Sequence, residues 1–326
     1  MFQRNKTNPK STTHLDLESL EARAVPATIA TSPVSIDVGV DDNAILQIDG
    51  SNYRDNVSVS VTGNYLYVFT SQPDLGIAYN RAYYFNAASV NRIHFSGRGS
   101  DDVFVNYSNE TTLAFGGDGN DYLYTNGLNS ALYGDNHSDT LVAGVYGNVA
   151  LVGGNHNDYM YGNDYANAMY GGSGNDTMYG NGGNDSMNGN DGYDYIRGGI
   201  GNDFIRGGNQ RDALYGDSGY DTLLGEGDRD VLVGGDHNDV LYGGDSTDYL
   251  YGGNGNDSLY GEAGRDYLFG QAHNDYLNGG RDGYFDYLSG GSGADRFEFH
   301  RSWWWFDVGE TDNHADYNYY EGDRVV

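Results

Sequence analysis

A nine-residue repeat constrains this chain more than any other feature of its sequence. From residue 171 to residue 278 the chain consists of twelve consecutive units, among them GGSGNDTMY (171–179) and GGNGNDSLY (252–260). Every unit opens with one or two glycines and has aspartate at its sixth position and a large apolar residue at its eighth. Less regular units occur upstream, around Asp101, Asp121 and Asp139, and others follow a two-residue insertion downstream. Such a regular short repeat predicts a solenoid, in which each unit stacks on its neighbours.

The composition of one unit predicts a turn followed by a short strand. Six residues rich in Gly, Asn and Asp favour a turn with positive φ, which glycine adopts at no steric cost. The last three residues, with the middle one apolar, fit a strand whose eighth position faces inward and whose seventh and ninth positions face outward. Two units then complete one coil of a flattened roll, so residues 18 apart stack at about 4.8 Å.

This stacking places the sixth-position aspartates in two columns, one containing Asp176 and Asp194 and the other Asp185 and Asp203. Carboxylates about 4.8 Å apart repel one another by several kcal/mol at an effective dielectric of about 20. Calcium between them solves the problem, because it accepts six to eight oxygen ligands and turn carbonyls supply the rest. The predicted metal ligands are Asp158, Asp176, Asp185, Asp194, Asp203, Asp212, Asp221, Asp230, Asp239, Asp248, Asp257, Asp266, Asp275, Asp286 and Asp295.

Two alternatives to a calcium site remain open. A Gly/Asp-rich tract with a formal net charge of −30 over 326 residues can be a solvated, disordered chain, although disorder does not need an apolar eighth position. A coil held by asparagine-like ladders needs no metal, although Asn would serve it better than ionised Asp. The unit at 162–170 carries Asn167 at its sixth position, which indicates one degraded binding position.

Histidine replaces the fourth-position glycine in three units, as His156, His237 and His273. One hypothesis makes them a column of transition-metal ligands. The favoured interpretation is that histidine tolerates the left-handed backbone conformation better than most side chains, because these three do not form a continuous row at a spacing of 18.

With these residues in place, the units resemble the GGxGxDxUx repeats of the hemolysin-type calcium-binding family, the RTX proteins. The resemblance is close over 153–298 and reaches back to about residue 96. It implies an all-β parallel β-roll, multiple Ca²⁺ ions between successive turns, and secretion. The sixth-position aspartates listed above are the residues to which the family's role as calcium ligands carries over.

The flanks predict caps and an export segment. Residues 1–30 contain HLDLESLEARAVPA (14–27), which is similar to the L-E-x-L-E-x-R-x-x-P segment of exported bacterial surface proteins. Residues 31–95 read as an N-terminal β cap with a hairpin turn at Gly63–Asn64, and 96–152 as degenerate repeats. The β-roll proper spans 153–298, and 299–326 form a C-terminal cap that includes Trp303–Trp305.

No feature of the sequence indicates catalysis. There is no cysteine, no H-E-x-x-H and no G-x-S-x-G motif. The charge disfavours nucleic acid, and no apolar stretch is long enough for a membrane span. We therefore expect a secreted or cell-surface calcium-binding protein that acts as a structural or interaction module. An ancillary module for a separately encoded secreted enzyme, and an adhesin that binds surface glycans through the tryptophans or the tyrosine face, remain alternatives.

Overall fold

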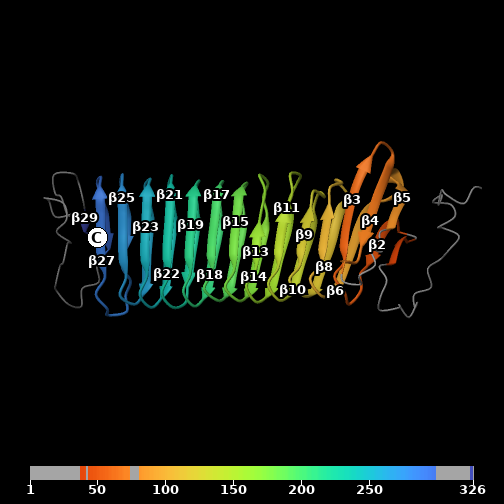
Figure 1. Cartoon of the computed structure of the whole chain (residues 1–326). Coiled ribbons are helices and arrows are strands. Elements are labelled where there is room, and N and C mark those ends of the chain that lie inside the picture. The colour runs from red at the N-terminus through yellow and green to blue at the C-terminus, as the bar shows by residue number, and fades with distance from the viewer. Residues whose placement is uncertain (1–36, 42, 74–80, 299–323, 326) are drawn as a thin grey trace, which may run out of the picture.

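The structure is a computed structural model that describes residues 37–41, 43–73, 81–298 and 324–325. These residues form an all-β parallel solenoid in which the chain alternates between two facing sheets (Figure 1). One short 3₁₀ helix, η2 (Ala87–Ser89), precedes β6. The predicted fold class, a parallel β-roll, is confirmed.

The sheet in which the described chain begins, here called the first sheet, has fifteen strands. In spatial order these are β1 (Asp37–Val40), β2 (Ile45–Asp49), β6 (Arg92–Gly99), β8 (Thr111–Asp118), β10 (Ser130–Asn136), β12 (Val149–Asn155), β14 (Ala168–Ser173), β16 (Ser186–Asp191), β18 (Phe204–Asn209), β20 (Thr222–Glu226), β22 (Val240–Asp245), β24 (Ser258–Ala263), β26 (Tyr276–Asn278), β28 (Arg296–Glu298) and β29 (Arg324–Val325).

The second sheet has fourteen strands and faces the first. In chain order these are β3 (Asn56–Thr62), β4 (Tyr65–Ser71), β5 (Arg81–Asn86), β7 (Val103–Asn106), β9 (Tyr122–Thr125), β11 (Thr140–Ala143), β13 (Tyr159–Tyr161), β15 (Thr177–Gly182), β17 (Tyr195–Ile200), β19 (Ala213–Ser218), β21 (Val231–Asp236), β23 (Tyr249–Asn254), β25 (Tyr267–Ala272) and β27 (Tyr287–Ser292).

Residues 18 apart stack in the regular part of the roll, as the repeat predicts. Thr177 lies beside Tyr195 in the parallel pair β15–β17, and Ser186 lies beside Phe204 in β16–β18. The turns that lead from the first sheet to the second form one edge of the roll, here called the first edge. The turns that lead back form the second edge.

The strands are longer than the sequence predicted, and the turns are shorter. Most repeat strands have six residues, such as β15 with TMYGNG, and only three residues separate it from β16. The strand therefore continues through the opening glycine of the next unit, because alternation then buries both the eighth-position side chain and that glycine. The expectation of a six-residue turn and a three-residue strand was wrong.

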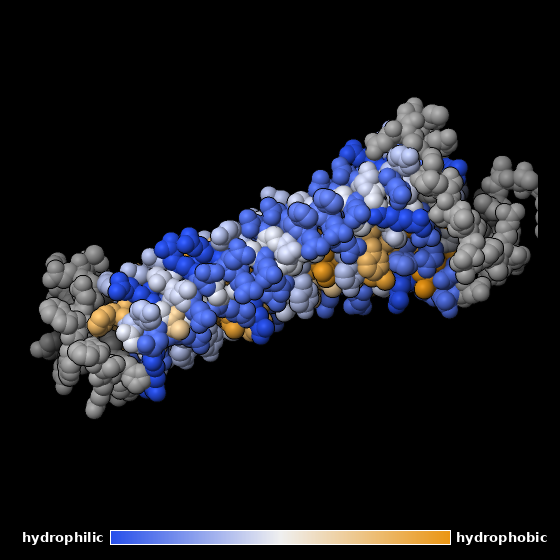
Figure 2. All heavy atoms as spheres, turned by 90° about the horizontal axis from the view of Figure 1, so that it is seen from below, coloured by the Kyte–Doolittle hydropathy of each residue, from blue (hydrophilic) through white to orange (hydrophobic). Residues whose placement is uncertain are grey.

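The core is a narrow double row of apolar side chains. Eighth-position residues such as Met178, Ile196 and Leu214 are fully buried, with 0% of their surface exposed. The face of the roll seen in Figure 2 is mainly hydrophilic. Tyrosines on the outer faces stack on one another, with 4.9 Å between the ring centroids of Tyr242 and Tyr260 and 4.8 Å between those of Tyr249 and Tyr267.

An antiparallel cap covers the N-terminal end of the roll. Strands β3 and β4 pair through the predicted hairpin, with Gly63 at a φ of 62°, and β5 pairs with β4. Strands β2 and β3 already run parallel to β6 and β7, so they make the first coil. At the other end β29 pairs with β28. The export-like segment within 14–27 and Trp303–Trp305 lie outside the described residues.

Candidate metal centre

The structure brings the sixth-position aspartates together in two columns, one along each edge. The first edge carries Asp158, Asp176, Asp194, Asp212, Asp230, Asp248, Asp266 and Asp286, and the second carries Asp185, Asp203, Asp221, Asp239, Asp257, Asp275 and Asp295. All of these side chains are buried except that of Asp286, which is half-buried beside the two-residue insertion.

One oxygen of each carboxylate has a fixed role within the column. Its Oδ1 accepts a hydrogen bond from the backbone N–H of the aspartate one coil earlier, at 2.8 Å for Asp194 N–H to Asp212 Oδ1. This bond repeats down both columns and places a positive N–H dipole between successive carboxylates. The sequence alone suggested carboxylates facing each other with only a cation between them, and the N–H contact is an addition to that picture.

The other oxygen, Oδ2, is buried in the twelve carboxylates from Asp176 to Asp275 and has no hydrogen-bond partner there within the described structure. A buried, partnerless carboxylate oxygen is costly, so it requires either a proton or a cation.

Opening glycines leave room for these oxygens. A Cβ placed on Gly243 would lie 2.6 Å from Asp248 Oδ2 and 2.7 Å from the carbonyl oxygen of Gly261 in the next coil. A carboxylate oxygen and a carbonyl oxygen thus converge on space that only glycine leaves open. Oxygen ligands of both kinds suit calcium, which requires neither nitrogen nor sulfur.

Carbonyl groups are essential to any such site. No three His, Asp or Glu side chains within the described residues gather into a cluster that could hold a metal ion. The residues present fit calcium only as a mixed set, with Asp Oδ2 atoms and the carbonyls of opening glycines. When bound, calcium would supply the positive charge that the buried columns lack.

The carboxyl pKa values reflect this burial. Burial raises the pKa of Asp212 to about 8, the hydrogen bond from Asp194 lowers it in part, and the charges of Asp194 and Asp230 raise it further. Burial likewise raises the pKa of Asp176 to about 6 and of Asp230 to about 7. Protons and cations therefore compete for the same oxygens near neutral pH.

Three column members were not among the predicted ligands. Asp121 and Asp139 belong to the first-edge column, as does Asp102, whose Oδ1 accepts the N–H of Asp55 at 2.7 Å. The upstream unit predicted around Asp101 is wrong by one residue, because Asp101 is half-buried and pairs with Arg54 at 3.1 Å. The missed signal was the spacing, since Gly97 precedes Asp102 by five residues, as the opening glycine precedes the sixth-position aspartate in the regular units.

The fourth-position histidines follow the favoured interpretation. His156, His237 and His273 have φ values of 76°, 84° and 83°, in the left-handed region. His137 and His156 stack at 5.3 Å between ring centroids, but no ligand cluster forms around them in the described range 81–298. At Asn167, Oδ1 accepts the N–H of Asn163 at 2.9 Å, so a neutral amide begins the second-edge column.

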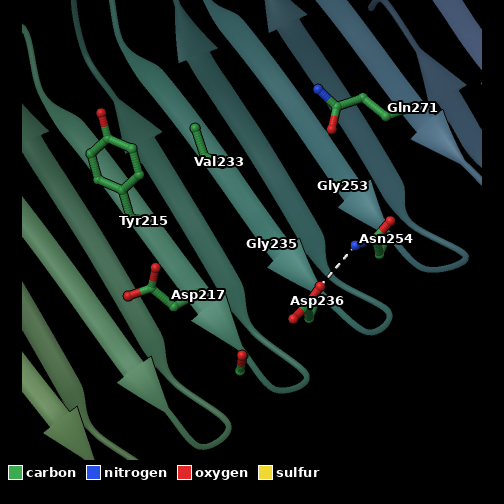
Figure 3. A pocket seen from close by; sticks show the side chains of 9 residues that line it. Tyr215, Asp217, Val233, Gly235, Asp236, Gly253, Asn254 and Gln271 are labelled. Atoms are coloured by element: carbon green, nitrogen blue, oxygen red, sulfur yellow. Dashed lines mark hydrogen bonds between the residues drawn. The ribbon is translucent and has the colours of Figure 1, made fainter.

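A shallow groove lies on the outer face of the second sheet, across β19, β21, β23 and β25 (Figure 3). Its volume is about 350 Å³, its floor includes Gly235 and Gly253, and Tyr215 and Gln271 stand at opposite ends. Asn254 Nδ2 donates to Asp236 Oδ1 at 2.9 Å within it. The groove is separate from the aspartate columns, whose side chains point into the roll.

The fold is a parallel solenoid with two buried aspartate columns, and the opening glycines leave space beside the carboxylate oxygens. These features define a calcium-binding β-roll. The family model for the RTX calcium-binding nonapeptide repeat matches the chain in overlapping segments at 115–145, 133–164, 152–187, 161–196, 188–223, 224–259, 251–285 and 282–299. These segments cover more than half of the chain, which belongs to this family. No curated protein matches the chain. No helix in the described residues is long and apolar enough to cross a membrane.

The opening glycines provide a test with a matched control. A Cβ on Gly225 would meet the Gly243 carbonyl oxygen at 2.5 Å and Asp230 Oδ2 closer still, whereas the nearest atom to a Cβ on Gly227 is 3.5 Å away. Gly225→Ala should destabilise the calcium-loaded roll by about 1–3 kcal/mol, as overpacking does. Gly227→Ala should change little. Thermal unfolding in calcium checks both, and equal effects would contradict the proposed crowding.

Proposed function

We propose that the chain is a secreted or cell-surface protein whose β-roll folds on binding Ca²⁺ and then serves as a structural or interaction module. The observation that carries this is the run of twelve consecutive carboxylates with a buried, partnerless oxygen. Their burial is tolerable only when a counter-charge is present, so calcium binding and folding are coupled.

The proposed ligands are the fifteen sixth-position aspartates predicted from the sequence, together with Asp102, Asp121 and Asp139. Their oxygens would act in pairs with the carbonyls of opening glycines one coil away. Because their pKa values are raised, these carboxyls hold protons near neutral pH. Calcium displaces those protons when it binds, so calcium binding releases protons.

An extracellular role predicts weak individual sites. Calcium sites of extracellular modules have dissociation constants of about 10⁻⁴–10⁻³ M, which keeps them empty in the cytosol and filled outside. Equilibrium dialysis of the full chain should therefore give half-saturation in that range, with several ions bound and little magnesium. Half-saturation below about 10⁻⁶ M would argue against calcium as a trigger outside the cell.

The absence of catalytic motifs supports a non-enzymatic role, and an ancillary role beside a secreted enzyme fits the same module. Glycan adhesion is the second candidate, and the groove between Tyr215 and Gln271 is the described surface that favours it. Binding to a glycan array that is lost in Tyr215→Ala but kept in Tyr242→Ala, on the opposite sheet, would support adhesion. Equal binding by both variants would remove this groove from consideration.

A further inference from the structure

We propose that residues 37–167 form a folding seed that keeps its structure without calcium and on which the coils of 168–298 assemble. This inference rests on the proposed function, because it assumes that the later coils require calcium. It is carried by a contrast between two parts of the chain that are equal in length.

The two parts differ in their buried carboxylates. Four carboxylates in 37–167, those of Asp102, Asp121, Asp139 and Asp158, have a buried oxygen without a hydrogen-bond partner, against twelve between Asp176 and Asp275. All four lie along the first edge. Each coil of the first part therefore has at most one such carboxylate, whereas the coils between Asp176 and Asp275 have two, one at each edge.

Neutral side chains occupy the second edge of the early coils. Asn106 Nδ2 donates to Thr112 Oγ1 at 2.8 Å, and Thr125 Oγ1 donates to the same oxygen at 3.0 Å. The backbone N–H of Thr112 donates to Ser130 Oγ at 2.9 Å. All four side chains are buried. Because their polar atoms have neutral partners, this edge needs no ion.

The next coils extend this neutral edge to the start of the aspartate column. Asn163 Nδ2 donates to the carbonyl oxygens of Gly144 and Gly147 at 2.7 and 3.0 Å. The backbone N–H of Asn167 donates a hydrogen bond to Asp185 Oδ1 at 2.7 Å. The second-edge column therefore begins at two neutral residues, Asn163 and Asn167, that are hydrogen-bonded.

The first-edge column begins at its N-terminal end with Asp55, whose oxygens are hydrogen-bonded to neutral groups. Asp55 Oδ2 accepts the N–H of Ser51 at 2.6 Å, and its Oδ1 accepts Ser51 Oγ at 3.2 Å and Gln72 Nε2 at 2.9 Å. Both oxygens of Asp55 thus have partners from the protein, unlike those further along the column. This end of the column is complete without a cation.

Apolar burial also favours the first part. Nineteen of the fully or nearly fully buried apolar residues lie in 37–167 and fifteen in 168–298. Phe95 and Phe104 stack at 4.7 Å between ring centroids where the cap meets the roll. The antiparallel strands β3, β4 and β5 add contacts between residues close in sequence, which lower the entropic cost of nucleation.

Once the seed is formed, β12 in the first sheet and β13 in the second each present an open strand edge, with which β14 and β15 pair in the complete roll. The next coils can add there one at a time. In repeat proteins each coil contacts only its neighbours, so a folded end is a template for propagation. Calcium would then be needed for propagation from 168 onward and not for nucleation.

Hydrogen exchange of the full chain tests the proposal. In EDTA at pH 8, amides of the strands between 92 and 161 should exchange at least tenfold more slowly than those between 168 and 298. In millimolar calcium both parts should be protected. Equally fast exchange of both parts in EDTA would overturn the seed. Protection of both parts in EDTA would instead contradict calcium-coupled folding, so the two failures are distinguishable.

A matched pair of core variants gives a second test. Leu132 in β10 and Leu241 in β22 are both eighth-position leucines of the first sheet with 0% exposure. Leu132→Ala should remove protection from 92–161 in EDTA and slow calcium-triggered folding of 168–298 by about tenfold or more. Leu241→Ala should leave protection of 92–161 in EDTA unchanged. If the two variants slow downstream folding equally, the early coils are not the template.

Discussion

Replacing Asp212, Asp230 and Asp248 together with asparagine is expected to have opposite effects with and without calcium. Asparagine keeps an oxygen at the position that accepts the N–H of the previous column member. It removes the negative charge that holds the cation. The calcium concentration at the midpoint of folding should therefore rise by about tenfold or more, because ligand charge sets affinity.

Without calcium the same triple variant should be more stable than the original chain. A buried amide costs about 1–3 kcal/mol when imperfectly paired, and an unpaired buried charge costs several kcal/mol. Far-UV circular dichroism in EDTA at pH 8 should show this gain as more β signal than the original chain keeps, while calcium titration followed by circular dichroism shows the loss. An ordinary destabilising substitution would lower stability in both conditions.

Exposed aspartates in the same stretch provide the control. Asp228, Asp236 and Asp245 lie at the surface of the same coils and outside the columns. Changing these three to asparagine removes the same charge from the chain and should leave the calcium midpoint within about threefold of its original value. If this control raises the midpoint as much as the column variant, net charge and not the columns governs the calcium response.

Acid is expected to replace calcium in part. Burial raises the pKa of the carboxyls from Asp158 to Asp275 to between about 6 and about 8, against about 3.9 in an unfolded chain. A carboxyl whose pKa is raised on folding binds its proton more tightly in the folded state. Its contribution to the stability of the calcium-free roll is complete below about pH 4 and is lost as pH rises through 6 to 8.

In EDTA the chain should therefore hold most of its β signal at pH 5 and lose the part that comes from 168–298 by pH 8. With calcium the trend reverses, and the midpoint concentration should be about tenfold higher at pH 5 than at pH 7.5, since protons occupy the ligand oxygens. A calcium-free roll that is more stable at pH 8 than at pH 5 would contradict the assignment of these carboxyls.

The sequence predicted the roll and its columns because the sixth and eighth positions of the repeat follow one rule in all twelve units of 171–278. Aspartate at the sixth position and an apolar residue at the eighth fix the inward face, and a period of 18 fixes the stacking of Asp176 on Asp194. The length of the strands was missed because glycine is a poor strand former in sequence terms. In the structure, Gly180 lies within β15 because its missing side chain admits Asp185.

The early coils were less predictable because their edges differ from each other. Asp102, Asp121 and Asp139 mark the first edge at a spacing of 18 or 19, so they can be recognised once that period is known. The second edge replaces aspartate with Asn106, Thr125 and their partners, which only tertiary contacts bring together. Dissimilar side chains that perform the same capping role leave no repeat to detect.

Calcium titration of the EDTA-stripped full chain at pH 8, followed by far-UV circular dichroism with magnesium as control, shows directly whether the roll folds on binding calcium. We expect a cooperative gain of β signal with calcium, none with magnesium at the same concentration, and a residual signal from 37–167 before calcium is added. A chain that is fully folded in EDTA at pH 8 and unchanged by calcium would contradict this expectation, because the buried aspartate columns would then be stable without a counter-ion.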